Sequence, residues 1–179
     1  MSRSSTVRPA SAVRHCPRCG APLPTPPPTA CDSCGYAVFL NARPTASLIV
    51  LDGPLSAQAQ FLALRRAAEP QAGRWETPGG FCDGWEHPRE AALREGREEL
   101  GVDVTLLDFV GMYVGTYPYQ GEDLPVLDCF WLARLPGSDA ISLDPAESSA
   151  HTWLPVVDPP PLAFSTMDDA LRDVAARLA

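Results

Sequence analysis

Short apolar runs separated by turn residues dominate the chain from Tyr36 to its end. Residues 46–51 and 61–65 are predicted to be buried strands, joined by a turn at 52–54. The segment 115–125 is expected to be an irregular excursion, because it is rich in glycine and proline. Further strands are predicted at 109–114, 126–134 and 151–156.

Two segments have the character of helices. Residues 86–100 have His87 at the cap position, Pro88 at a position suited to the first helical residue, and Gly101 just beyond the end. Residues 165–178 are amphipathic, because apolar residues recur at helical spacing. This stripe consists of Ala170, Leu171, Val174, Ala175 and Leu178. Strands combined with two helices that can cover a sheet predict a layered α/β or α+β domain.

Length and charge limit the classes of function. The 179 residues suit one domain with a small appendage. No apolar run long enough to cross a membrane and no secretory signal are recognised, so a cytoplasmic location is expected. The net charge of −8 argues against nucleic acid as the main partner, although residues 1–45 have a local excess of arginine. An acidic surface still binds anionic ligands where its carboxylates hold metal ions.

The helix predicted at 86–100 carries the most informative pattern. Glu95, Glu98 and Glu99 are spaced i, i+3 and i+4, so three carboxylates converge on one face. Clustered carboxylate oxygens suit Mg²⁺ or Mn²⁺, ions that bridge carboxylates to substrate phosphates. Upstream, Gly79 and Gly80 allow the backbone to approach a ligand or an ion closely. Three glutamates alone are more often a solvated helix face, so the metal-site interpretation rests on their spacing relative to other residues.

Arg94 is predicted to hold the loop that enters this helix. It lies four residues after Glu90 and eight residues after Glu86, so both carboxylates lie on its side of the helix. A guanidinium at this place pairs with the acids around it and fixes the loop against the helix.

The complete run resembles the Nudix box, Gly-x5-Glu-x7-Arg-Glu-U-x-Glu-Glu-x-Gly-U, in which U is apolar. The positions that match are Gly80, Glu86, Arg94, Glu95, Glu98, Glu99, Gly101 and Val102. One position departs, because Gly96 occupies the first apolar slot. A glycine inside a helix costs about 1 kcal/mol relative to alanine, so either the helix lies close to the sheet there or it is less stable.

The resemblance implies the Nudix fold, an α/β/α sandwich with a mixed sheet. It also implies metal-dependent hydrolysis of the pyrophosphate linkage of a nucleoside diphosphate linked to another moiety. By position in the motif, the ligands of Mg²⁺ or Mn²⁺ are Glu95, Glu98, Glu99 and the Gly80 carbonyl. Glu95 also orients or deprotonates the attacking water. The candidate catalytic residues are therefore Arg94, Glu95, Glu98 and Glu99, with Arg94 and Glu86 holding the loop and helix together.

Four cysteines near the N-terminus have the spacing of a zinc site. Cys16 and Cys19 form one C-x2-C pair and Cys31 and Cys34 form a second, which predicts tetrahedral binding of one structural Zn²⁺. His15 is an alternative ligand, but four thiolates already close the site. The pattern resembles a zinc ribbon. The expected organisation is a flexible N-terminus at 1–14, the ribbon at 15–36 and a Nudix domain at 37–179.

The zinc ribbon before a Nudix domain resembles the NADH diphosphatase group. That group carries a Ser-Gln-Pro-Trp-Pro-Phe-Pro run after the box, whereas residues 112–119 read MYVGTYPY here. An ADP-linked substrate such as ADP-ribose or a dinucleotide is therefore expected. NADH cleavage or removal of NAD caps from RNA, and a non-catalytic ligand-binding or nucleic-acid-binding regulator, stay open as alternatives. Family resemblance also allows a homodimer.

Other residues are candidates with open alternatives. Gly79 and Gly80 are expected to contact substrate, and Glu76 to contact substrate or metal. Tyr117 and Tyr119 either stack on an adenine or pack beside a strand. Glu147 is either a further catalytic carboxylate or a solvated loop acid. Cys82 and Cys129, outside the two pairs, are expected to be buried small hydrophobic residues.

Overall fold

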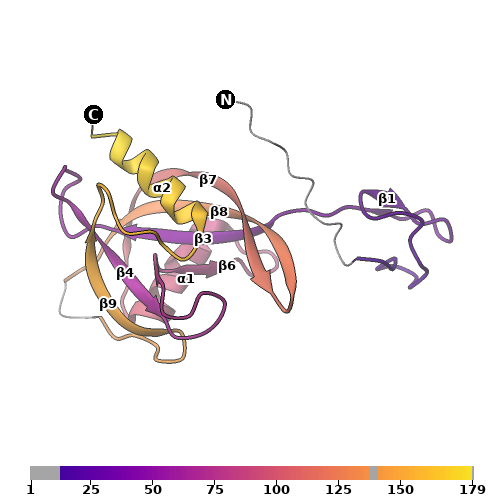
Figure 1. Ribbon diagram of the computed structural model, residues 1–179, viewed down its shortest axis with the longest axis horizontal. Helices are drawn as coiled ribbons and strands as arrows, with labels where there is room; N and C mark the ends of the chain where they lie inside the picture. The colour runs from indigo at the N-terminus through magenta and orange to yellow at the C-terminus, as the bar shows by residue number, and fades with distance from the viewer. Residues whose placement is uncertain (1–12, 138–140, 179) are drawn as a thin grey trace. The chain divides into compact units, whose positions relative to one another are not determined.

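The computed structural model describes residues 13–137 and 141–178. Most of the segment 1–14, expected to be flexible, lies outside the described residues. Two compact units are present, one formed by residues 13–41 with 120–122 and the other by residues 42–119 with 123–178 (Figure 1). Neither helix in the described part of the chain has the length and apolar character needed to span a bilayer.

The N-terminal unit contains one small antiparallel sheet. Its strands are β1 (Thr29–Ala30) and β2 (Ala37–Val38), and Thr29 is paired with Val38. The prolines at 22–28 form no helix, as expected for residues that lack an amide donor and have a fixed φ.

The larger unit contains a four-stranded and a three-stranded sheet. The first has the order β6-β3-β8-β7, and the second has the order β5-β4-β9. The strands are β3 (Arg43–Val50), β4 (Gln60–Arg66), β5 (Trp75–Glu76), β6 (Gly79–Phe81), β7 (Thr105–Tyr119), β8 (Glu122–Arg134) and β9 (Ser148–Pro155). Strands β3 and β8 are parallel, whereas β3 is antiparallel to β6, so the first sheet is mixed as the sequence predicts.

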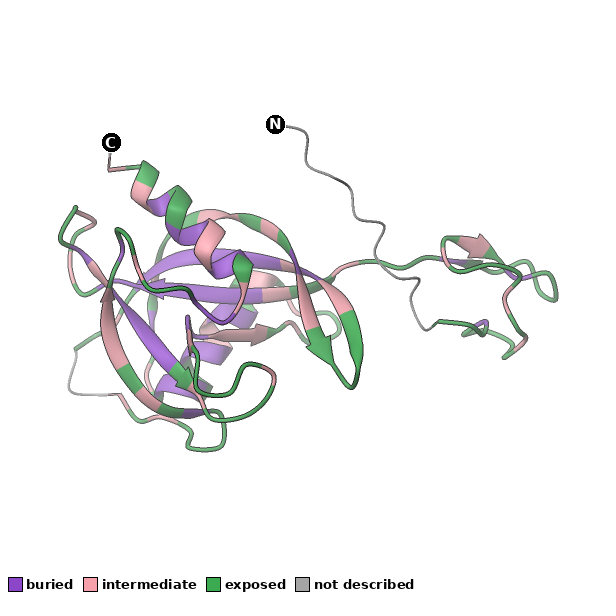
Figure 2. Cartoon of the chain, in the orientation of Figure 1, coloured by how far each residue is buried: buried purple, intermediate pink, exposed green. Residues whose placement is uncertain are grey.

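Helices α1 (Pro88–Leu100) and α2 (Ser165–Ala176) cover opposite faces of the strands (Figures 1 and 2). Alternate residues of β3 define the two cores. Leu48 and Val50 pack in a cluster with Leu100 of α1, whereas Ile49 packs in a second cluster with Leu171 of α2. A strand covered on both faces needs apolar residues at successive positions, which explains the continuous apolar run at 46–51. The α/β/α sandwich is confirmed.

The prediction that residues 115–125 form an irregular segment is wrong, because most of them belong to two strands. Strand β7 continues to Tyr119 and β8 begins at Glu122, and the turn between them has positive φ at Gln120 (50°) and Gly121 (83°). Two such residues close a tight hairpin. Pro118 lies in an edge strand, where a missing amide donor is tolerated. Pro125 precedes Val126, the first residue of β8 that pairs with β3.

The ends of α1 follow from local side-chain chemistry. His87 is the N-cap and accepts a hydrogen bond from the Arg89 backbone amide at 3.1 Å, while the Glu90 carboxylate accepts one from the His87 amide at 3.4 Å. This reciprocal pair is a capping box. The helix begins at Pro88, two residues later than predicted, and ends before Gly101, which adopts the left-handed conformation at φ 69°.

Gly96 lies at a close contact of α1 with β3 and Val104. A Cβ at this position would lie 3.0 Å from Val104 Cγ2 and 3.2 Å from Leu48 Cδ1. The space that an apolar side chain would occupy is therefore already filled, which favours close packing as the reason for glycine here.

Replacing Gly96 with leucine tests this packing. We expect the free energy of unfolding to fall by about 1–3 kcal/mol through overpacking, although leucine is the better helix former by roughly 1 kcal/mol. Denaturant unfolding measures the change. Gly53→Leu is the control, because a Cβ at Gly53 meets nothing within 4 Å. Equal stability of Gly96→Leu and the wild type would contradict the packing argument.

Candidate active site

The three clustered glutamates of α1 differ in their burial. Glu95 and Glu99 lie one turn apart on the side of the helix that packs against β3 and β6, and both are buried. The Glu98 side chain projects from the helix and is 56% exposed. A Glu99 carboxylate oxygen accepts a hydrogen bond from the Gly79 amide at 2.8 Å. Helix α1 therefore presents two buried carboxylates to the backbone of β6 and one to solvent.

The paired glycines of β6 make this close approach possible. A Cβ on Gly80 would lie 2.5 Å from Glu95 Oε1. Gly79 has a φ of 147°, and a Cβ there would lie 2.7 Å from the Ser47 Cα. The sequence predicts close approach to a ligand or an ion, and the contacts present are with the Glu95 carboxylate and with β3.

Arg94 connects the acidic face of α1 to the loop before it. Its Nε and Nη2 donate to the two oxygens of Glu86 at 3.0 and 2.9 Å, and Nη2 also donates to the Phe81 carbonyl at 2.9 Å. Its Nη1 donates to Glu95 and to Glu98, both at 2.8 Å. One guanidinium thus fixes the loop and compensates two like charges, an arrangement that a flexible ammonium cannot reproduce.

Burial and repulsion between neighbouring carboxylates raise the pKa values of the acids in this site. Burial raises the pKa of Glu99 well above its usual value, and the neighbouring Glu76 charge adds to the shift. Burial also raises the pKa of Glu76 to about 6, although Arg66 opposes the change. The pKa of Glu95 is raised by burial as well, against the influence of Arg94. The three acids are therefore harder to ionise here than in water, mainly because they are buried.

The donor set fits a divalent cation by its chemistry. Carboxylate and carbonyl oxygens are the preferred ligands of Mg²⁺ and Mn²⁺, and a dication favours the ionised form of buried acids. The glutamate oxygens are nevertheless not gathered tightly. In the described part of the chain, the one group of three or more ligand atoms within 4.8 Å of one another is the cysteine cluster.

A cavity of about 110 Å³ adjoins the glycine pair of β6. The predicted residues Glu76, Gly79, Gly80 and Tyr117 line it, whereas Tyr119 is exposed and is not among the lining residues. Its other lining residues are Thr45, Ser47, Arg66, Phe81, Thr116, Val126, Asp128, Phe164, Ser165, Thr166 and Met167.

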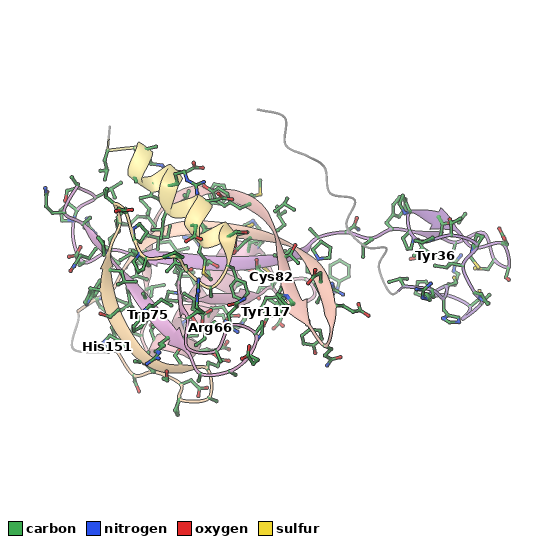
Figure 3. All side chains as sticks on the ribbon, in the orientation of Figure 1. Tyr36, Arg66, Trp75, Cys82, Tyr117 and His151 are labelled. Carbon is green, nitrogen blue, oxygen red and sulfur yellow. The ribbon has the colours of Figure 1, made fainter. Side chains whose placement is uncertain are left out.

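Aromatic rings form one wall of the cavity. The Tyr117 ring meets Phe81 edge-on, with centroids 5.3 Å apart, and Phe164 at 5.4 Å. Tyr117, labelled in Figure 3, lies in β7, packs against these two rings and also lines the cavity, so packing and contact with a ligand are compatible roles.

Arg66 and Asp128 are cavity residues that sequence reasoning missed. Arg66 pairs with Glu76, and its guanidinium lies over the Phe164 ring, 5.2 Å from the centroid. Both residues carried a usable signal, since Arg66 ends an apolar strand and Asp128 interrupts one.

Glu147 lies in an exposed turn just before β9. Its charge contributes to the raised pKa of Glu76, Glu95 and Glu99. The carboxylate is therefore close enough to influence the acidic site.

The four N-terminal cysteines lie together in the N-terminal unit. Cys16 Sγ is 3.7 Å from Cys34 Sγ, and Cys19 Sγ is 3.6 Å from Cys31 Sγ. All four sulfurs lie within 4.8 Å of one another. Tetrahedral Zn–S bonds of about 2.3 Å place sulfurs about 3.8 Å apart, so the cluster fits Zn²⁺.

The two cysteines outside this cluster differ in burial. Cys129 is buried, as expected, whereas Cys82 is partly exposed. Burial raises the pKa of both thiols, to about 11 for Cys82. Both side chains are therefore protonated at neutral pH.

Comparison with known proteins agrees with this geometry. The asymmetrical bis(5'-nucleosyl)-tetraphosphatase of Caenorhabditis elegans is 28% identical over 135 residues, which cover 75% of this chain and 96% of that protein. The NAD-capped RNA hydrolase NudC of Pseudomonas putida (strain W619) is 25% identical over 152 residues, which cover 83% of this chain but 50% of that protein.

A solved structure, the NUDIX hydrolase from Nitrosomonas europaea, superposes with a TM-score of 0.68 at 22% identity and covers 92% of both chains. The share of the curated relatives' own length that is matched ranges from 47% to 96%. The family description NUDIX domain matches residues 42–176, beginning at the residue where the larger unit begins. Because this match covers well over half of the sequence, the chain belongs to the Nudix hydrolase family.

Proposed function

We propose that this protein hydrolyses the pyrophosphate linkage of an ADP-linked compound, such as ADP-ribose or a dinucleotide, with Mg²⁺ or Mn²⁺. The observation that carries the proposal is the acidic face of α1 packed against the glycine pair of β6, directly beside an aromatic-walled cavity. The acids suit the metal-bound diphosphate, and the cavity suits a flat ring attached to it.

The ligands for the cation are Glu95, Glu98, Glu99 and the Gly80 carbonyl. When bound, the cation lowers the pKa of water and neutralises charge on the phosphates. Glu95 orients the attacking water and accepts its proton. Arg94 and Glu86 hold the loop against the helix, so that the carboxylates stay on one side of the reacting bond. Glu147 is a further acid within electrostatic reach of the site.

Cleavage of NADH or of NAD caps is the second candidate. The similarity to the NAD-capped RNA hydrolase of Pseudomonas putida favours it. Against it, residues 112–119 lack the motif of the NADH diphosphatase group and lie within β7. Relative rates on NADH and ADP-ribose separate the two candidates.

The Glu98→Gln variant tests the metal-dependent reaction. With Mn²⁺ and ADP-ribose, we expect turnover to fall by about 100-fold or more, because one ligand of the cation is lost. Chromatography of the nucleotide products measures the rate and identifies the bond that is cleaved. The exposed position makes a folding defect unexpected, and circular dichroism checks it.

Glu90→Gln is the matched control for this variant. It removes one carboxylate from the same helix, and glutamine preserves the capping box. Full activity of Glu98→Gln refutes the assignment of the metal ligands. Tight binding of ADP-ribose to the wild type without any hydrolysis favours the non-catalytic alternative.

Arg94→Lys tests the paired hydrogen bonds by which the Arg94 guanidinium holds the loop to the helix. Lysine keeps the charge but not the parallel hydrogen bonds, so we expect the free energy of unfolding to fall by about 1–2 kcal/mol. We also expect the Mn²⁺ concentration for half-maximal activity to rise. Arg97→Lys alters an exposed pair with Asp103 and should change stability by less than about 0.5 kcal/mol. Equal effects of the two substitutions would contradict a special role for Arg94.

The cysteine cluster is proposed to hold one structural Zn²⁺. A unit this small buries little apolar surface, so the metal supplies much of its folding free energy. We expect the Cys31→Ser variant to lose the zinc that elemental analysis finds in the wild type. Cys82→Ser should retain it, since Cys82 lies outside the cluster. Zinc retained at the wild-type level in Cys31→Ser would refute this assignment.

A further inference from the structure

The aromatic-walled cavity has a buried carboxyl group that the hydrolytic chemistry does not use. Asp128 lies on β8, is 6% exposed and lines the cavity. Its Oδ1 accepts a hydrogen bond from Ser47 Oγ at 2.9 Å, and its Oδ2 accepts one from Thr166 Oγ1 at 3.0 Å. These three residues come from β3, β8 and α2, so the position of the carboxyl group is fixed from three sides.

A carboxyl group at this depth is costly for the fold. Within the described residues, Asp128 forms no ion pair, and its side-chain partners are neutral hydroxyl groups. Burial raises its pKa, and the hydrogen bonds from Ser47 and Thr166 oppose that shift. An apolar side chain in the middle of β8 would avoid the desolvation penalty. The hydroxyl partners reduce this penalty but do not explain why an acid is present.

The Asp128 carboxyl group can accept a further hydrogen bond from a bound ligand. Ser47 and Thr166 donate to the two carboxyl oxygens, and Thr45 is a third hydroxyl partner of this group. A carboxylate offers about four lone-pair sites, so three hydroxyl partners leave one acceptor site for a ligand. Phe81, Tyr117 and Phe164 provide the rings beside it, and a planar heterocycle stacks well on such a surface. A flat ring with an N–H donor on its edge satisfies both features.

The cavity lies beside the proposed reaction site, so a ring bound in it would be close to the acids of α1. Gly79, Gly80 and Glu76 line the same cavity, and Gly79 is hydrogen-bonded to Glu99. A base held in the cavity therefore leaves its diphosphate beside the acidic face of α1.

We propose that Asp128 is a specificity-determining residue, which accepts a hydrogen bond from the exocyclic amino group of adenine and disfavours a base with a carbonyl oxygen at that place. This inference rests on the proposed function for the choice of adenine. The physical basis is that a carbonyl group brings a lone pair toward the acceptor oxygens of Asp128, whereas an amino group brings a hydrogen.

Equilibrium binding of AMP and IMP to the full-length protein tests the proposal. The two nucleotides differ at the six-position of the base, which bears an amino group in AMP and a carbonyl group in IMP, and at the adjacent N1, which carries a hydrogen only in IMP. Neither contains a phosphoanhydride bond. Titration followed by nuclear magnetic resonance is expected to show AMP binding at least about tenfold more tightly, as for a buried hydrogen-bonding site. Equal affinities of the wild type for AMP and IMP overturn the proposal, and this outcome does not depend on any variant folding.

The Asp128→Asn variant provides the second arm. Its amide can donate to a carbonyl oxygen, so the preference for AMP should fall to less than about threefold or reverse. Asp123→Asn is the matched control, because it makes the same change at an exposed position of the same strand. A folded Asp128→Asn protein that keeps the wild-type preference overturns the proposal.

The outcome is separable from that of the hydrolytic function. A clear preference for AMP in a protein that hydrolyses no ADP-linked compound refutes the reaction and supports the role of Asp128. Equal binding of AMP and IMP by an active hydrolase refutes the role of Asp128 alone.

Discussion

The close contact between α1 and β6 is the constraint on which the site depends. Two carboxylates, Glu95 and Glu99, are buried against a backbone that carries no side chains at positions 79 and 80. A single methyl group on Gly80 would occupy the space of the Glu95 carboxylate. On the helix itself, the missing side chain of Gly96 lets α1 lie close to Leu48 of β3. The site is therefore built as much from missing side chains as from acidic ones.

The features that the sequence predicted correctly are those fixed by interactions between neighbouring residues or by a regular apolar pattern. The ends of α1 follow from His87, Pro88 and Gly101, and each acts on its immediate neighbours. The continuous apolar run of β3 follows from helices on both faces. Glycine and proline near the β7–β8 turn gave the wrong prediction, because their effect depends on whether a strand lies at the edge of a sheet. That position is not encoded in neighbouring residues.

The cavity illustrates why the rest of the site could not be predicted. Ser47 and Asp128 are 81 positions apart, and Asp128 and Thr166 are 38 apart, yet all three meet at one carboxyl group. No spacing rule connects them. Glu95, Glu98 and Glu99 of α1, by contrast, lie within one run of five residues, so their convergence follows from helix geometry alone. The motif identifies the residues proposed to react, whereas the cavity proposed for the rest of the substrate is formed by tertiary packing.

The guanidinium of Arg94 serves as an internal counter-ion. Its Nη1 contacts oxygens of both Glu95 and Glu98, the groups assigned to the cation. A dication that uses these oxygens competes with the arginine, so part of its binding free energy is spent on displacement. The same side chain holds Glu86 and the Phe81 carbonyl, next to the fully exposed Trp85. Binding of the proposed cation and attachment of the 82–87 loop therefore depend on the same guanidinium, so each changes the free energy of the other by the same amount.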